Sequence, residues 1–164
     1  RRPFLALVAG ASASAAGAAL LGRSGQLRSA GSASATAPSR LRSSGGRLDL
    51  DLVAQETEVA IPGGPARALT YNGLLPGPLL EIDPGDAVRI NLHNRLPRPT
   101  NIHYHGLHIP PGGSGDNVFL SVGPGESHSY AFTLPADHPA GTFYYHPHSH
   151  GTVADQVPAG WEGC

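Results

Sequence analysis

The chain has 164 residues, enough for one domain of ordinary size. Charged residues make up 14% of it and the formal net charge is -1, which argues against a nucleic acid as partner. The 22 glycines and 16 prolines indicate many turns between short strands rather than long helices. The only cysteine, Cys164, has no partner in the chain, so an internal disulfide is excluded.

The first residues, "RRPFLALVAGASASAAGAALLG", resemble a twin-arginine export signal, with Arg1 and Arg2 ahead of a mildly apolar stretch. A membrane anchor is the alternative, but a stretch rich in Ala, Gly and Ser gains little energy in a bilayer, so we expect no stable membrane span. Residues 22–46 continue without periodicity and are typical of a flexible linker. We therefore assign residues 1–46 to a signal and linker, and expect an exported protein, periplasmic or extracellular. Because the chain contains no methionine, we also expect its true start to lie upstream.

From Arg47 onward, apolar residues alternate with polar ones, as in half-buried strands. Turn motifs such as "DPGD", "PPGGSGDN" and "GPGE" separate these runs. Short strands at this spacing predict an all-β domain, an antiparallel sandwich or barrel. The residues predicted to face the core are Leu48, Leu50, Leu52, Val88, Ile90, Leu92, Tyr130, Phe132 and Leu134.

Two histidine clusters stand out, "TNIHYHGLHIPP" at 100–111 and "TFYYHPHSHGT" at 142–152. His103 and His105 flank one residue, so both point to the same side of an extended chain, roughly 6.6 Å apart. That spacing favours two ligands on neighbouring metals over two ligands on one. His146 and His148 flank a proline, which marks a strand end. The two pairs could therefore converge on one polynuclear metal centre.

The residues alone leave the metal open between copper and zinc, although copper has the higher intrinsic affinity for imidazole. The other five histidines are left out of the predicted ligand set. We expect His93, His128 and His138 to face solvent. His108 should face away from the first histidine pair, and His150 should lie where its strand ends.

Three segments together resemble the first cupredoxin domain of the multicopper oxidases, the laccase-like family: "YNGLLPGPLLEIDPGDAVRINLHNRL", "TNIHYHGLHIPP" and "GTFYYHPHSHGTVADQV". The resemblance implies a cupredoxin-like (plastocyanin-like) Greek-key β-sandwich or barrel over residues 47–158. It also implies copper ligands. His103 would bind the type 2 copper, His105 and His146 one type 3 copper, and His148 the other type 3 copper.

In that family the trinuclear copper site reduces O2 to water while an electron-donor substrate, a phenol or a metal ion, is oxidised. Electrons come from a type 1 copper in the last domain. An acid in the loop after the first histidine pair assists proton delivery to O2 in several members, and Asp116 in "GGSGDN" is similarly placed. The alternative for Asp116 is a turn-forming residue beside Gly115.

The sequence also departs from the family pattern. A type 1 copper site needs a cysteine with two histidines, and Cys164 in "GWEGC" has no histidine nearby, so we expect no type 1 site in this chain. The four histidines of a later cupredoxin domain are also absent. Residues 159–164 form an atypical tail where an apolar closing strand is expected. We therefore expect the domain to lack its last strand, and the chain alone to be inactive.

Three interpretations stay open at this point. The chain could be the N-terminal part of an exported multicopper oxidase, whose remaining copper ligands lie in C-terminal cupredoxin domains. It could be a copper- or zinc-binding module without turnover. It could also be a truncated product without function, because an unpaired sheet edge favours aggregation.

Overall fold

The computed structural model describes residues 39–61, 63–151, 156 and 163–164. The predicted export signal and residues 159–162 of the predicted tail lie outside this set. The described residues form eight strands, and none of their helices is long and apolar enough to cross a membrane. The strands are β1 (Arg40–Arg42), β2 (Arg47–Ile61), β3 (Gly64–Tyr71), β4 (Leu79–Glu81), β5 (Ala87–Asn94), β6 (His103–His105), β7 (Ser127–Thr133) and β8 (Tyr144–His146).

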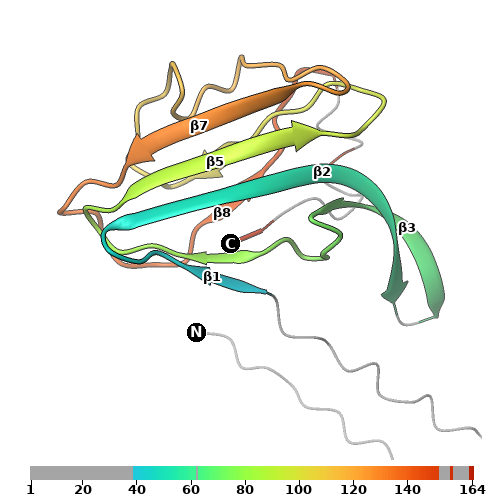
Figure 1. Ribbon diagram of the computed structural model, residues 1–164, viewed down its shortest axis with the longest axis horizontal. Coiled ribbons are helices and arrows are strands. Elements are labelled where there is room, and N and C mark those ends of the chain that lie inside the picture. Colours follow the sequence, from blue (N-terminus) through green and yellow to red (C-terminus); the bar gives the residue numbers. More distant parts are fainter. Residues whose placement is uncertain (1–38, 62, 152–155, 157–162) are drawn as a thin grey trace, which may run out of the picture. The chain divides into compact units, whose positions relative to one another are not determined.

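Four of the strands form one sheet in the order β3-β2-β5-β7. Strand β2 is 15 residues long, and it bends where it leaves β5 and pairs with β3 (Figure 1). The β2–β5 pair is parallel, whereas β2–β3 and β5–β7 are antiparallel. The parallel β2–β5 pair is a departure from the antiparallel sandwich or barrel expected from the sequence, because a period of two residues indicates burial and says nothing of strand direction.

The other two sheets have two strands each, β1-β4 and β6-β8. Strand β1 lies in the segment that the sequence assigns to a flexible linker, and it pairs in parallel with β4. Its Arg40 contacts Glu81 of β4 at 2.7 Å. Three residues are too few to display a period, which explains why β1 escapes sequence analysis.

The predicted inward-facing residues form the core, as expected. All are buried except Leu50, which is half-buried and packs against the rest. They come from β2, β5 and the β7 region, and so line one face of the four-stranded sheet. The two-stranded β6-β8 sheet contributes Tyr104 and Tyr145 to the same core cluster.

Tyr104 and Tyr145 attach the β6-β8 pair to that face. The Tyr104 ring packs edge-on against Tyr130 and Phe132, with ring centroids 6.1 and 5.2 Å away. Tyr145 packs against Tyr71 at 5.4 Å, and its hydroxyl donates a hydrogen bond to the Pro78 carbonyl at 2.8 Å. Because side chains alternate along a strand, the neighbours of the two tyrosines point away from the core.

The last two residues also take part in this region. Gly163 exchanges two backbone hydrogen bonds with Tyr145, at 2.8 and 3.0 Å. The carbonyl of Cys164 accepts a hydrogen bond from the Leu80 amide at 2.6 Å. These two residues of the predicted tail therefore lie between β8 and β4.

Tyr104 offers a test of the packing that attaches β6. Its hydroxyl is buried without a hydrogen-bond partner, so Tyr104→Phe should change the free energy of unfolding by less than about 1 kcal/mol. Tyr104→Ala should cost about 3 to 5 kcal/mol, because it leaves a cavity against Tyr130 and Phe132. Urea unfolding followed by circular dichroism measures both. Equal losses in the two variants would show that the hydroxyl, rather than the ring, carries the stabilisation.

Candidate metal centre

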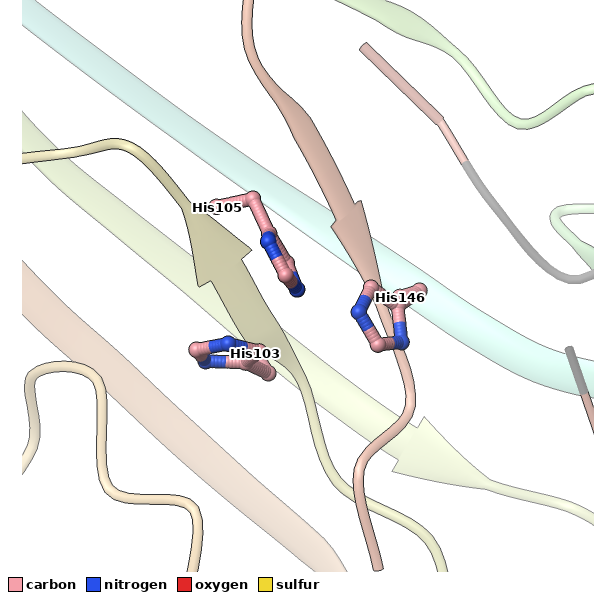
Figure 2. Close-up of side chains that lie close together, drawn as sticks. All are labelled: His103, His105 and His146. Atoms are coloured by element: carbon pink, nitrogen blue, oxygen red, sulfur yellow. The ribbon is translucent and has the colours of Figure 1, made fainter. Parts of the chain in front are cut away.

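The histidines of the two clusters meet because β6 and β8 pair in one register. In this antiparallel ladder His103 lies opposite His146, and His105 lies opposite Tyr144. Figure 2 shows the rings of His103, His105 and His146 on the same side of the strand pair, directed toward one another. One ligand nitrogen from each of the three lies within 4.8 Å of the others. This arrangement could hold a single metal ion, whereas the sequence spacing favours two.

His148 lies beside this group of three. Its ring centroid is 5.1 Å from that of His103 and 6.1 Å from that of His146. Its Nδ1 is buried without a hydrogen-bond partner, an arrangement that costs free energy unless another species binds there. The donor set of four imidazoles and this unpaired nitrogen fit a metal that prefers nitrogen ligands.

Asp116 is in contact with the centre. Its Oδ1 lies 2.8 Å from Nδ1 of His103 and accepts a second hydrogen bond from the Tyr104 amide at 3.1 Å. An ionised carboxylate only accepts, so Nδ1 of His103 carries the proton and Nε2 keeps the lone pair that binds a metal. Asp116 therefore orients His103, a role that sequence analysis did not foresee.

His146 is oriented in a similar way by the backbone. Its Nδ1 lies 2.8 Å from the Pro147 carbonyl, which can only accept a hydrogen bond. Nδ1–H is therefore the donor, and Nε2 is left free for a metal. His146 is also the most buried of the four, with 8% of its surface exposed.

Asn101 is a residue of this region that sequence analysis missed. It is fully buried, and its Oδ1 accepts a hydrogen bond from the His148 amide at 2.6 Å. Its Nδ2 donates to the carbonyls of Val118 and Leu120 at 3.1 and 2.9 Å. One side chain thus connects the loop after Asp116 to the backbone of His148. No local sequence signal identifies it, since all its partners are distant in the chain.

Gly106 explains why a glycine follows the first histidine pair. Its φ is +82°, a conformation that favours glycine. A Cβ atom at this position would lie 2.8 Å from Cδ1 of Phe143, closer than packed carbons come. The chain can therefore turn sharply away after His105 while Phe143 packs over the turn.

The remaining histidines lie outside the centre. The expectation that His138 faces solvent is wrong, because only 6% of its surface is exposed. Its Nδ1 donates to the Pro139 carbonyl and its Nε2 accepts from the His108 amide, so both ring nitrogens are satisfied. His93 and His128 are half-buried rather than fully solvent-facing, and His108 and His150 are exposed.

Burial sets the protonation of two histidines in the centre. Loss of water around His105 lowers its pKa, and the neighbouring His103 lowers it further. Burial likewise lowers the pKa of His146, against an opposing effect of its hydrogen bond to Pro147, and the nearby histidines add to the lowering. A lowered pKa keeps imidazole in its neutral form, which is the form that binds metals.

A sequence profile of multicopper oxidases matches residues 53–164, a range that includes the whole histidine centre. The chain belongs to the multicopper oxidase family. The all-β cupredoxin-like fold and the family resemblance predicted from the sequence are thereby confirmed, and membership in the family implies copper.

Relatives of this multicopper oxidase chain include copper resistance protein A of Pseudomonas syringae pv. tomato. It is 38% identical over 136 residues, which are 82% of this chain and 22% of the relative. Laccase-12 of Arabidopsis thaliana is 37% identical over 60% of this chain and 18% of its own length. The solved multicopper oxidase of Campylobacter jejuni, a metallo-oxidase, aligns with a TM-score of 0.66 and 36% identity, covering 77% of this chain and 27% of that one. The chain thus spans about a fifth of the length of its curated relatives.

The lowered pKa values predict how stability depends on pH. The ordinary histidine pKa is 6.5, and His105, His128 and His146 lie below it in the folded chain. As pH falls through 6.5, the unfolded chain takes up protons more readily than the folded chain. The free energy of unfolding of the metal-free protein should therefore decrease from pH 7.5 to 5.5.

Urea unfolding in the presence of a chelator measures this decrease. His146→Gln should make it smaller, because one of the three shifted groups is removed. For each protein, the free energy of unfolding at lower pH is compared with its own value at pH 7.5. Any effect of the substitution that does not depend on pH therefore cancels. An equally large decrease in His146→Gln would show that His146 does not contribute.

Proposed function

We propose that this chain supplies half of the type 2/type 3 trinuclear copper site of a multicopper oxidase. The observation that carries the proposal is the convergence of His103, His105 and His146 within 4.8 Å, with His148 beside them. His103 would bind the type 2 copper, and His105 and His146 would share one type 3 copper. His148 would bind the other type 3 copper.

In the complete oxidase, bound copper would take electrons from a phenol or metal-ion substrate and pass them to O2. The residues of this chain would hold the imidazoles ready for that role. Asp116 keeps the proton on Nδ1 of His103, and the Pro147 carbonyl does the same for His146. The Asp116 side chain is 15% exposed, so its carboxylate could also exchange a proton with water near the centre, as proton delivery to O2 requires.

Four histidines leave a trinuclear site of this family half complete. We propose that the other four, together with the type 1 copper that receives electrons from the substrate, belong to C-terminal cupredoxin domains. The side of the β6-β8 pair that carries the histidines would face those domains. O2 reduction would then need both parts, and no turnover is expected from residues 1–164 alone.

A second candidate function is favoured by the tight grouping of three histidines. Three imidazoles within 4.8 Å can bind one ion without any partner domain, as a copper-binding module does. The two candidates differ in what the isolated chain binds and in what a partner domain adds. A gain of copper equivalents on addition of a C-terminal domain would favour the oxidase.

Copper titration tests the ligand assignment. His103→Ala combined with His148→Ala should remove most copper binding by the isolated chain, measured by calorimetry, because two of four imidazoles are lost. The matched control, His93→Ala with His128→Ala, removes two histidines outside the centre and should leave binding unchanged.

The copper-loaded chain should also lack the intense blue colour of a copper–thiolate bond, since the ligands are imidazoles. Strong blue absorption, or equal loss of binding in the control pair, would contradict the assignment. Either result would place the copper on other residues.

We also propose that the protein is exported by the twin-arginine route, on the basis of Arg1 and Arg2 ahead of the weakly apolar stretch. Replacing both arginines by lysine keeps the charge and should leave the protein in the cytoplasm. Immunoblots of periplasmic and cytoplasmic fractions measure this. The same change at Arg40 and Arg42 serves as control, and normal export of the Arg1/Arg2 variant would refute the route.

A further inference from the structure

The histidines of the centre differ in what fixes the direction of their rings. Nδ1 of His103 is bound to Asp116, and Nδ1 of His146 is bound to the Pro147 carbonyl. For His148, Asn101 binds the backbone amide, and Nδ1 of the ring has no hydrogen-bond partner among the described residues. Among the described residues, no hydrogen bond reaches the ring of His105. The last torsion of a histidine side chain is broad, so an unsupported ring samples many directions.

Tyr144 is the side chain stacked on this ring; His103 and His146 also lie near it, with centroids 4.6 and 4.9 Å away. Tyr144 lies directly opposite His105 in the β6-β8 ladder, and the two rings are stacked, with centroids 4.2 Å apart and planes 14° from parallel. The Tyr144 ring is also nearly parallel to that of His146, at 17° and 5.6 Å. Figure 2 shows the labelled rings of His105 and His146 on opposite strands of the β6-β8 pair.

We propose that Tyr144 is a positioning residue that holds His105 in its metal-binding orientation by stacking. This inference rests on the proposed function. A metal ion draws electron density from its imidazole ligands, so a bound His105 is more positive than a free one. The electron-rich face of a tyrosine attracts positive charge, and the stack should therefore be stronger when the metal is bound.

Tyr144 is also one of the residues that line a neighbouring cavity of about 510 Å³. Among the described residues, the cavity wall includes Leu80, Ile82, Phe143 and Tyr144, but none of the four histidines of the centre. A smaller side chain at position 144 would remove the ring that covers one face of His105.

The test compares side chains that keep or remove the aromatic ring. Tyr144 is 45% exposed, and Tyr144→Phe removes only its hydroxyl and keeps the stack, so this variant should bind Cu(II) within about twofold of the parent chain. Tyr144→Leu removes the stack and should weaken Cu(II) binding by about tenfold, the low end of losses for residues that orient metal ligands. Calorimetry measures affinity, and electron paramagnetic resonance should show altered copper hyperfine splitting in Tyr144→Leu only.

Two further variants control for folding and for the loss of any exposed aromatic group. Phe119 is 82% exposed and lies outside the histidine centre, so Phe119→Leu should leave both readouts unchanged. Tyr144→Ile, which suits a strand, replaces Tyr144→Leu if the latter does not fold by circular dichroism. Normal affinity and normal hyperfine splitting in a folded Tyr144→Leu or Tyr144→Ile chain would overturn the proposal.

A His105→Ala background separates this inference from the proposed function. If Tyr144 acts through His105, Tyr144→Leu should have no further effect on Cu(II) affinity once His105 is gone. If His105→Ala itself leaves affinity unchanged, His105 is no ligand and the proposed function fails. If His105→Ala weakens binding and Tyr144→Leu does not, only the positioning role fails.

Discussion

The arrangement of the histidine centre depends on two tyrosines that anchor the β6-β8 strand pair to the core. Tyr104 and Tyr145 are the middle residues of β6 and β8, and each is buried against aromatic residues of the core. Strand alternation then places the residues on either side of them on the opposite face. The histidines of the two strands thus gather outside the core because the tyrosines next to them are buried inside it. The aromatic packing fixes the position of the pair, and the register fixes which imidazoles meet.

Around that pair, three imidazoles are held by different contacts: His103 by a carboxylate, His146 by a backbone carbonyl and His105 by an aromatic face, while an amide side chain holds the backbone of His148. These contacts come from separate parts of the chain. Asp116 lies on a loop, Asn101 lies before β6, and Tyr144 is part of β8. Such contacts order the side chains of a candidate metal site before any ion binds, which lowers the entropy lost on binding.

Much of the fold could be predicted from the sequence because burial follows a period of two. The inward faces of β2, β5 and β7 follow from that rule alone, and so does the common side of His103 and His105. The parallel direction of β2 and β5 could not be predicted, since alternation is the same for either direction. The roles of Asn101 and Tyr144 could not either, because each depends on which residue lies opposite in space. The burial of His138 could not be predicted either, because it depends on contacts with distant parts of the chain, including the backbone of His108.

The pairing of β6 with β8 also has a consequence for the order of folding. The ladder that joins His103 to His146 connects segments far apart in the sequence, and so does the parallel ladder of β2 and β5. Contacts between distant segments form slowly, because a long loop must close before they gain any energy. No nascent chain that ends before β8 contains the centre. The complete group of three histidines therefore exists only once β8 has paired with β6.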